Sequence, residues 1–231
     1  MISRAGLARL VLLVAALGSA LQANAETLTV DGWAFRHSSE VDIQLKKPAI
    51  KEDVLAGAFL AEVADSSFLA FCVDIFQETK FDRAISDYSL MSATSLFGAA
   101  KATDLGRLAT GFYTKVVDAA TAGAFQIAVW EIVNEKNGNA YNLRGGSFKA
   151  FADSKQVQAL AQDWLNNLPQ ANTYSLDIWH SPSHQDLAVF SALGEVMSPV
   201  PEPATVALVL AGLSLLGMAR REEPKGIHKR G

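Results

Sequence analysis

The chain has 231 residues, enough for one domain with a sizeable core, and 50% of them are hydrophobic. Its formal net charge at pH 7 is -4. Because both terminal segments are basic, the part between them is more acidic still, which argues against nucleic acid or anionic lipid as a natural partner. The single cysteine, Cys72, excludes an intramolecular disulfide.

The first 25 residues have the three-part layout of a secretory signal peptide. Arg4 and Arg9 form a basic start, residues 10–21 are almost uninterruptedly apolar, and Ala23-Asn24-Ala25 is a small-x-small cleavage site. A buried N-terminal helix is the alternative, but the order of basic, apolar and small segments favours export. We therefore predict that residues 1–25 are removed.

The mature chain opens with a strand-like pattern that extends to about residue 76. Apolar and polar residues alternate in TLTVDGWAFR (27–36) and again in VDIQL (41–45). The stretch AGAFLAEVADSSFLAFCVDI (56–75) predicts two strands that are joined near residues 64–67.

The middle of the chain is predicted to be helical. One helix begins at Asp104 (DLGRLATGFYTKVVDAA, 104–120) with apolar residues at helical spacing. Thr121 is the expected N-cap of AGAFQIAVWEIVNE (122–135), which is apolar on nearly every face and so should be deeply buried. A third, amphipathic helix is predicted over 147–169 and ends at Pro169.

The domain, residues 26–198, is predicted to end in a hairpin of TYSLDIW (173–179) and DLAVFSAL (186–193), with a turn at residues 181–183. Strands, then helices, then strands indicate an α+β fold. We expect a β-rich, sandwich- or barrel-like domain with a helical insert between the Cys72 strand and the C-terminal strands.

Two residues in this apolar pattern raise chemical questions. A lone cysteine in an exported protein is an inert buried thiol, half of an intermolecular disulfide, or a reactive thiol. Free cysteine behaves as a small hydrophobe, so its apolar strand alone favours the inert thiol. Gln126 lies in a helix that is apolar on both sides, where an unpaired amide costs a few kcal/mol. A hydrogen bond to a strand backbone removes that cost, and so does conversion of the amide into an acyl group.

Two short motifs around these residues resemble the signature of bacterial thioester domains, best known from Gram-positive surface adhesins. The motifs are Phe71-Cys72-Val73-Asp74 and Phe125-Gln126-Ile127-Ala128-Val129-Trp130. The resemblance implies that the Cys72 thiol and the Gln126 side chain condense, with loss of ammonia, into an internal thioester. A lysine amine of a partner, or an amine or hydroxyl of a matrix polymer, would then attack the Gln126 acyl carbon and release the thiol.

This bond formation is single-use, so the chain is predicted to be a reactive adhesin and not a turnover enzyme. No metal and no cofactor are expected.

A thioester must be hidden from water until its target arrives. Phe71, Phe125 and Trp130 are the candidates for the apolar side chains that exclude water from the thioester, although each is equally well explained as an ordinary core aromatic. Asp74 is expected on the same strand face as Cys72, where it can orient the site or assist proton transfer. A purely structural role is the alternative for Asp74.

Two other functions stay open. In one, the protein is a non-covalent surface, biofilm-matrix or exopolysaccharide-associated module in which Cys72 and Gln126 are merely buried. In the other, it is a secreted cysteine hydrolase or transglutaminase-like enzyme that pairs Cys72 with His180 or His184. Those histidines flank a predicted turn without a carboxylate or cysteine at ligand spacing, which favours a solvated hairpin loop over a metal or catalytic site.

The C-terminal segment 199–221 resembles the PEP-CTERM sorting signal of Gram-negative bacteria. It contains Pro201-Glu202-Pro203, an apolar run at 204–219, and the pair Arg220 and Arg221. The run is short for a helix that crosses about 30 Å of hydrocarbon, which needs about 20 residues, so the transmembrane helix suits a transient inner-membrane anchor. The arginines should hold the tail, residues 222–231, on the cytoplasmic side.

The resemblance implies that an exosortase recognises this segment and removes it at or near the Pro-Glu-Pro. The body of the protein would then go to the cell surface or the extracellular matrix.

Overall fold

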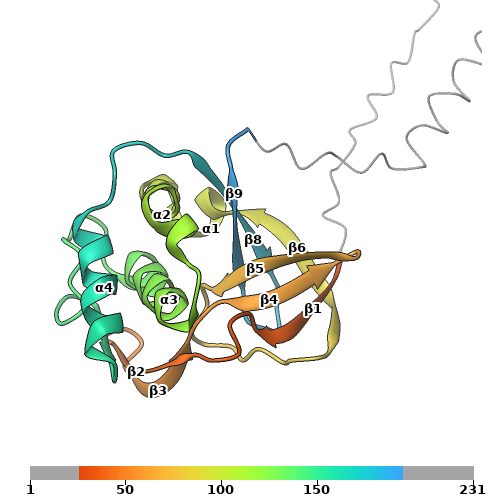
Figure 1. The fold of residues 1–231 in the computed structure, drawn as a ribbon, viewed down its shortest axis with the longest axis horizontal. Helices are drawn as coiled ribbons and strands as arrows, with labels where there is room; N and C mark the ends of the chain where they lie inside the picture. The colour runs from red at the N-terminus through yellow and green to blue at the C-terminus, as the bar shows by residue number, and fades with distance from the viewer. Residues whose placement is uncertain (1–25, 195–231) are drawn as a thin grey trace, which may run out of the picture. The chain divides into compact units, whose positions relative to one another are not determined.

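A computed structural model describes residues 26–194 and has the predicted α+β character (Figure 1). Inter-residue contacts divide the chain after Ser191, and nearly all the described residues belong to the first unit. The signal peptide predicted at 1–25, the sorting segment predicted at 199–221 and the tail at 222–231 lie outside the described residues.

Six strands form a closed barrel in the order β1-β4-β5-β9-β8-β6. Antiparallel pairing joins β1 to both β4 and β6, β4 to β5, β5 to β9, and β6 to β8. The barrel strands are β1 (Glu26–Trp33), β4 (Phe59–Val63), β5 (Ser66–Cys72), β6 (Ala84–Ser92), β8 (Tyr174–His180) and β9 (Leu187–Ala192). The barrel, the Cys72 strand and the C-terminal hairpin thus agree with the predicted β-rich domain.

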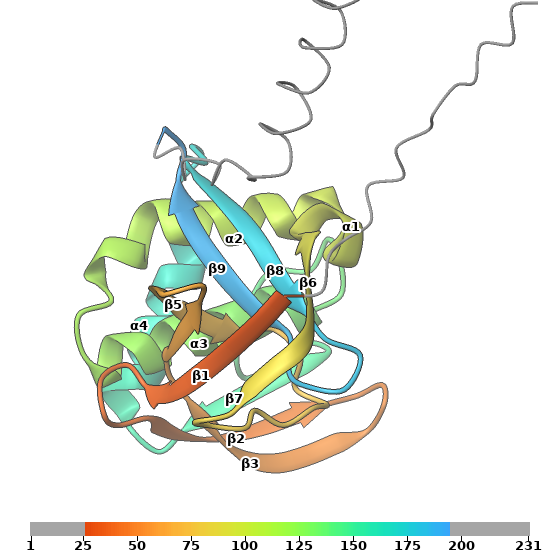
Figure 2. The ribbon, with the colours of Figure 1, turned by 90° about the vertical axis from the view of Figure 1, so that its right-hand side faces the viewer.

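A second, three-stranded antiparallel sheet has the order β3-β2-β7. Its strands are β2 (Ser39–Leu45), β3 (Ile50–Ala56) and β7 (Phe148–Ala152). In both views β2 and β3 lie along one edge of the domain, below the barrel strands (Figure 1 and Figure 2).

The helices gather on one side of the barrel, with α3 in the middle of them (Figure 1). They are α1 (Ala93–Phe97), α2 (Ala99–Phe112), a 3-10 turn at Tyr113–Lys115, α3 (Ala119–Asn134) and α4 (Lys155–Asn166). Helix α3 contacts β5 of the barrel, all three strands of the second sheet, α2 and α4.

Every residue of α3 from Ala122 to Ile132 is buried, which confirms the prediction of a deeply buried helix. Gly123 makes this position possible, because a Cβ there would collide with the Ser39 side chain and lie 3.4 Å from the Ala56 carbonyl oxygen. A glycine therefore lets α3 approach β2 and β3 closely.

The N-cap of α3 is Asp118, not Thr121 as the sequence pattern predicted. The Asp118 carboxylate accepts a hydrogen bond from the Thr121 N–H at 2.8 Å, and the Thr121 hydroxyl accepts one from the Asp118 N–H at 3.1 Å. The two residues form a capping box, in which threonine takes the place of the usual Glu or Gln three positions into the helix.

Two other predicted boundaries were wrong. Helix α2 begins at Ala99, before the predicted Asp104. The helix predicted over 147–169 is a strand, β7, followed by α4, because residues 148–152 complete the sheet beside β2 and Ser154 caps α4. Strand β6 was not predicted from the sequence, and β3 lies within the strand-like region expected up to about residue 76 but was not delimited there.

Glu131 is an acid inside this core. One of its carboxylate oxygens accepts the Asn142 N–H at 2.7 Å, and the other has no hydrogen-bond partner among the described residues. Burial raises the pKa of Glu131 to about 7; the Asn142 N–H opposes the rise and the nearby Glu135 adds to it.

Glu131 should therefore make stability fall as the pH rises. The folded state holds the proton more tightly than the unfolded chain, where the pKa is near 4.5, so the stabilisation is complete below about pH 4.5 and is lost as the pH rises to about 7. We expect Glu131→Gln to match the wild type in acid and to exceed its stability above about pH 7. Urea unfolding across this range measures the difference, with the exposed-site variant Glu40→Gln as control. A Glu131→Gln advantage that does not change with pH would contradict the prediction.

Candidate functional site

Cys72 is the last residue of β5 and lies where β4 no longer covers that strand. The pairing of β4 with β5 ends at Phe59 opposite Ala70. On its other edge, β5 pairs Cys72 with Leu187 of β9. The main-chain N–H and C=O of Cys72 therefore lie beyond the last β4 pair and need another partner.

The Gln126 side chain on α3 is that partner. The Cys72 N–H donates to Gln126 Oε1 at 2.8 Å, and Gln126 Nε2 donates to the Cys72 carbonyl at 2.8 Å. Gln126 is 1% exposed. The amide thus takes the place of a neighbouring strand. These bonds to a strand backbone also give the buried glutamine the hydrogen-bond partners that it requires.

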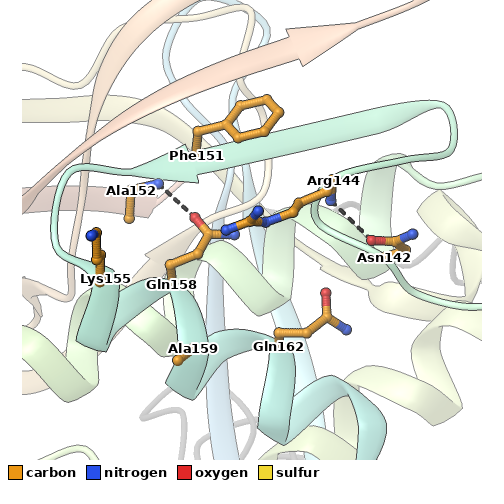
Figure 3. A pocket seen from close by; sticks show the side chains of 8 residues that line it. All are labelled: Asn142, Arg144, Phe151, Ala152, Lys155, Gln158, Ala159 and Gln162. Atoms are coloured by element: carbon orange, nitrogen blue, oxygen red, sulfur yellow. Dashed lines mark hydrogen bonds between the residues drawn. The ribbon is translucent and has the colours of Figure 1, made fainter.

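A second glutamine holds a strand in the same way, with no cysteine nearby. Gln158 of α4 accepts the Ala152 N–H at 2.6 Å (Figure 3). It also donates to the Ala150 carbonyl at 3.0 Å. Both partners belong to β7. A buried amide that holds a strand is therefore a structural device of this fold, and what distinguishes Gln126 is that both of its bonds go to the residue that carries the thiol.

The groove beside Gln158 has a volume of about 470 Å³ and lies between β7 and α4 (Figure 3). Gln162, which also lines it, accepts the Leu143 N–H at 3.0 Å and donates to the Tyr141 carbonyl at 3.1 Å. Because both glutamines are engaged with main-chain groups, this groove is explained by the packing of α4.

The Cys72 thiol is 2% exposed and donates to the Asp74 main-chain carbonyl at 3.1 Å. Burial raises the pKa of Cys72 to about 12, and the indole N–H of Trp130 is the largest influence against that rise. The same indole N–H is buried and makes no hydrogen bond among the described residues. Trp130 therefore offers an unused hydrogen-bond donor beside the sulfur. A donor at this position stabilises the thiolate form of Cys72.

A pocket of about 620 Å³ reaches this pair, and Cys72, Gln126 and Trp130 all line it. The pocket includes a group of three aromatic rings, Trp33, Phe59 and Phe81, that was not predicted from the sequence. Trp33 and Phe59 stack with ring centroids 4.7 Å apart, and Phe81 lies 5.8 Å from each. The only sequence signal for them was aromatic character, because they come from β1, β4 and the chain before β6.

The other predicted supporting residues divide into two groups. Phe71 and Phe125 are fully buried and pack on each other with centroids 4.7 Å apart, on the core side of the pair and away from the pocket. Asp74 follows the end of β5, so the strand-face expectation does not apply to it. Its carboxylate accepts the Phe76 N–H at 2.8 Å, and its main-chain carbonyl, not its carboxylate, reaches the thiol.

The two histidines are occupied elsewhere. His180 Nδ1 lies 2.9 Å from the Asp186 carboxylate, and His184 Nδ1 lies 2.9 Å from the Ser183 hydroxyl. Neither histidine bonds Cys72 in the described part of the chain, as a cysteine hydrolase would require. Within residues 26–194 no three His, Cys, Asp or Glu side chains are arranged to hold a metal ion.

Comparison with known proteins gives a sorting motif and a set of similar solved structures. Residues 199–221 match the PEP-CTERM protein-sorting motif, which implies export and a C-terminal anchor with surface display. None of the helices within residues 26–194 is long and apolar enough to cross a membrane. No curated protein sequence matches the chain.

Among solved structures, the chain is similar to the N-terminal thioester domain of a surface protein from Clostridium perfringens, with a TM-score of 0.41 and 15% identity over 67% of this chain and 99% of that one. It is also similar to the thioester domain of the Staphylococcus aureus TIE protein, with a TM-score of 0.42 and 12% identity over 70% of this chain and 92% of that one.

The Trp130 donor can be tested on a chain that keeps a free thiol. In a Gln126→Leu background, Trp130→Phe should slow alkylation of Cys72 by iodoacetamide about tenfold at mildly alkaline pH, because a hydrogen bond to a charged group is worth about 1.5–3 kcal/mol. Mass spectrometry of the alkylated chain gives the rate. Trp179→Phe makes the same chemical change outside the pocket and serves as control. Equal rates in the two variants would show that the Trp130 N–H does not act on the sulfur.

Proposed function

We propose that this exported protein forms an internal thioester between Cys72 and Gln126 and uses it to attach covalently to a surface or matrix partner. The observation that supports the proposal is the Gln126 amide, held by two 2.8 Å hydrogen bonds on the main chain of the residue that carries the only thiol. The pair also lies at the end of a pocket through which a nucleophile can approach.

In thioester formation, Cys72 Sγ attacks the side-chain carbonyl carbon of Gln126. An S–C bond forms, the C–N bond breaks, and the nitrogen leaves as ammonia with the proton of the thiol. The Cys72 N–H, which already donates to Gln126 Oε1 at 2.8 Å, stabilises the negative charge that develops on that oxygen. The same oxygen remains in the thioester, so this hydrogen bond can persist.

In the attachment step, an amine or hydroxyl of the partner attacks the same carbon. The C–S bond breaks, Cys72 leaves as a thiol, and an amide or ester joins Gln126 to the partner. The Trp130 N–H favours the departing sulfur because it can donate to sulfur that carries negative charge. The thioester is consumed in this step, so the protein acts once, as an adhesin, and does not turn over as an enzyme.

Burial protects the bond before attachment. Cys72 and Gln126 are 2% and 1% exposed, and their chain neighbours Phe71 and Phe125 are fully buried. Water therefore reaches the carbonyl carbon only from the pocket side.

The sorting motif at 199–221 supports the rest of the proposal. We propose that an exosortase removes this segment after transient anchoring in the inner membrane, and that the body is displayed at the cell surface or in the matrix.

One observation favours a second candidate, a non-covalent surface or matrix module. Both polar atoms of the unreacted Gln126 amide have a hydrogen-bond partner, as do those of the Gln158 amide, and the thioester would give up the bond from Nε2 to the Cys72 carbonyl. In this alternative, Gln126 only fastens α3 to β5.

Intact mass separates the two candidates. The purified protein should be lighter than its calculated mass by one ammonia, titrate no free thiol, and gain one methylamine on incubation with that amine. Cys72→Ala and Gln126→Ala should each abolish the ammonia loss.

Gln158→Ala is the matched control for the mass experiment, because it removes a buried strand-holding amide of the same kind without touching the pair. It should still lose one ammonia. A wild-type protein of unmodified mass with a titratable thiol would refute the thioester and favour the non-covalent module.

A further inference from the structure

The pocket above the reactive pair has a chemical character of its own. We infer that it selects a primary ammonium on a flexible aliphatic chain, as in a lysine side chain, over a neutral hydroxyl. This inference rests on the proposed thioester, since it names the class of nucleophile that the thioester accepts.

The first reason is the charge of the lining. Glu52 of β3 and Glu78, which follows β5, both line the pocket and are both exposed. No Lys, Arg or His is among the described residues that line it. Glu52 and Val54 lie two positions apart on β3 and so share one face, which places an apolar surface beside the carboxylate. A chain of methylenes that ends in a positive charge complements this combination.

The second reason is the aromatic wall formed by Trp33, Phe59 and Phe81. The three rings contact one another at centroid distances of 4.7 and 5.8 Å, and Phe81 is 41% exposed. The face of an aromatic ring is electron-rich and attracts an ammonium group, whereas it offers a neutral hydroxyl no comparable attraction.

The third reason is an unused acceptor. Gln77 lines the pocket, and its side-chain oxygen Oε1 is buried and has no hydrogen-bond partner among the described residues. An ammonium has three donors, so it can meet this oxygen and a carboxylate at the same time, while a hydroxyl has one donor. The ammonium can thus donate to the unpaired Gln77 oxygen and still keep its contact with a carboxylate.

The chemistry of attack is compatible with this recognition. The ammonium gives one proton to a pocket carboxylate or to water and becomes a neutral amine. Its nitrogen then attacks the Gln126 acyl carbon, the C–S bond breaks, and the second proton lost by the nitrogen is taken up by the Cys72 sulfur. The products are an amide and a free thiol, so atoms and charges balance.

Two nucleophiles of different charge test the inference on the purified protein. Butylamine, which mimics the lysine side chain and is cationic at neutral pH, should react with a rate that saturates. Hydroxylamine, which is neutral at that pH, should react with a rate that stays proportional to its concentration. Adduct formation is followed by intact mass.

The variants Glu52→Gln and Glu78→Gln should each slow the butylamine reaction about threefold, and the double variant about tenfold, because each removes an exposed opposite charge. The hydroxylamine rates should not change. Glu40→Gln removes the same charge from an exposed position on β2 outside this pocket and should leave both rates unaltered.

The possible failures are distinct. If the wild type has lost one ammonia but the pocket variants keep the butylamine rate, or slow both probes equally, the pocket does not select cations and the inference is wrong. If the wild type has lost no ammonia and forms no adduct with either probe, the thioester itself is refuted and the inference fails with it.

Discussion

The arrangement of this domain depends on one polar contact in an apolar core, the pair of hydrogen bonds between the Gln126 amide and the main chain of Cys72. Helix α3 is buried from Ala122 to Ile132 and offers the barrel an almost entirely hydrophobic surface. Hydrophobic contact is non-directional, so it fixes neither the rotation of the helix about its axis nor its position along that axis. Two directional bonds to one residue fix both. They also satisfy the main-chain groups that β4 leaves unpaired, so a single side chain closes the barrel edge and positions the helix.

The same fold provides a comparison that separates structure from chemistry. Gln158 and Gln162 of α4 hold main-chain groups with amides much as Gln126 does, without a thiol beside them. Hydrogen bonding of a buried glutamine is therefore an expected solution to a packing problem. The features of Gln126 that go beyond packing are the sulfur of the residue it holds, the unused indole N–H of Trp130 next to that sulfur, and the pocket that reaches both.

Features with a local cause could be predicted from the sequence, whereas those that depend on distant partners could not. The stretch 56–75, read as two strands joined near residues 64–67, predicted the Cys72 strand, and the uniformly apolar 122–135 stretch predicted a buried helix. Strand β3 has the exposed charges Lys51, Glu52 and Asp53 and is a strand because it pairs with β2 along its whole length, a fact that no local pattern contains. Cys72 and Gln126 were linked by their motifs alone, since 54 residues separate them and contact required the fold. The aromatic wall was missed for the same reason, because its three rings come from separate segments.

The early end of β4 also has a mechanical consequence. In the proposed thioester, the bond at this gap would turn the chain between residues 72 and 126 into a closed ring, and a cross-link around a ring of about 55 residues lowers the entropy of the unfolded chain enough to add about 4 kcal/mol of stability. Reaction with a target opens that ring. The domain would therefore be most rigid before attachment, while the thioester is intact. After attachment it would unfold more easily under tension, with the new linkage to the partner still intact.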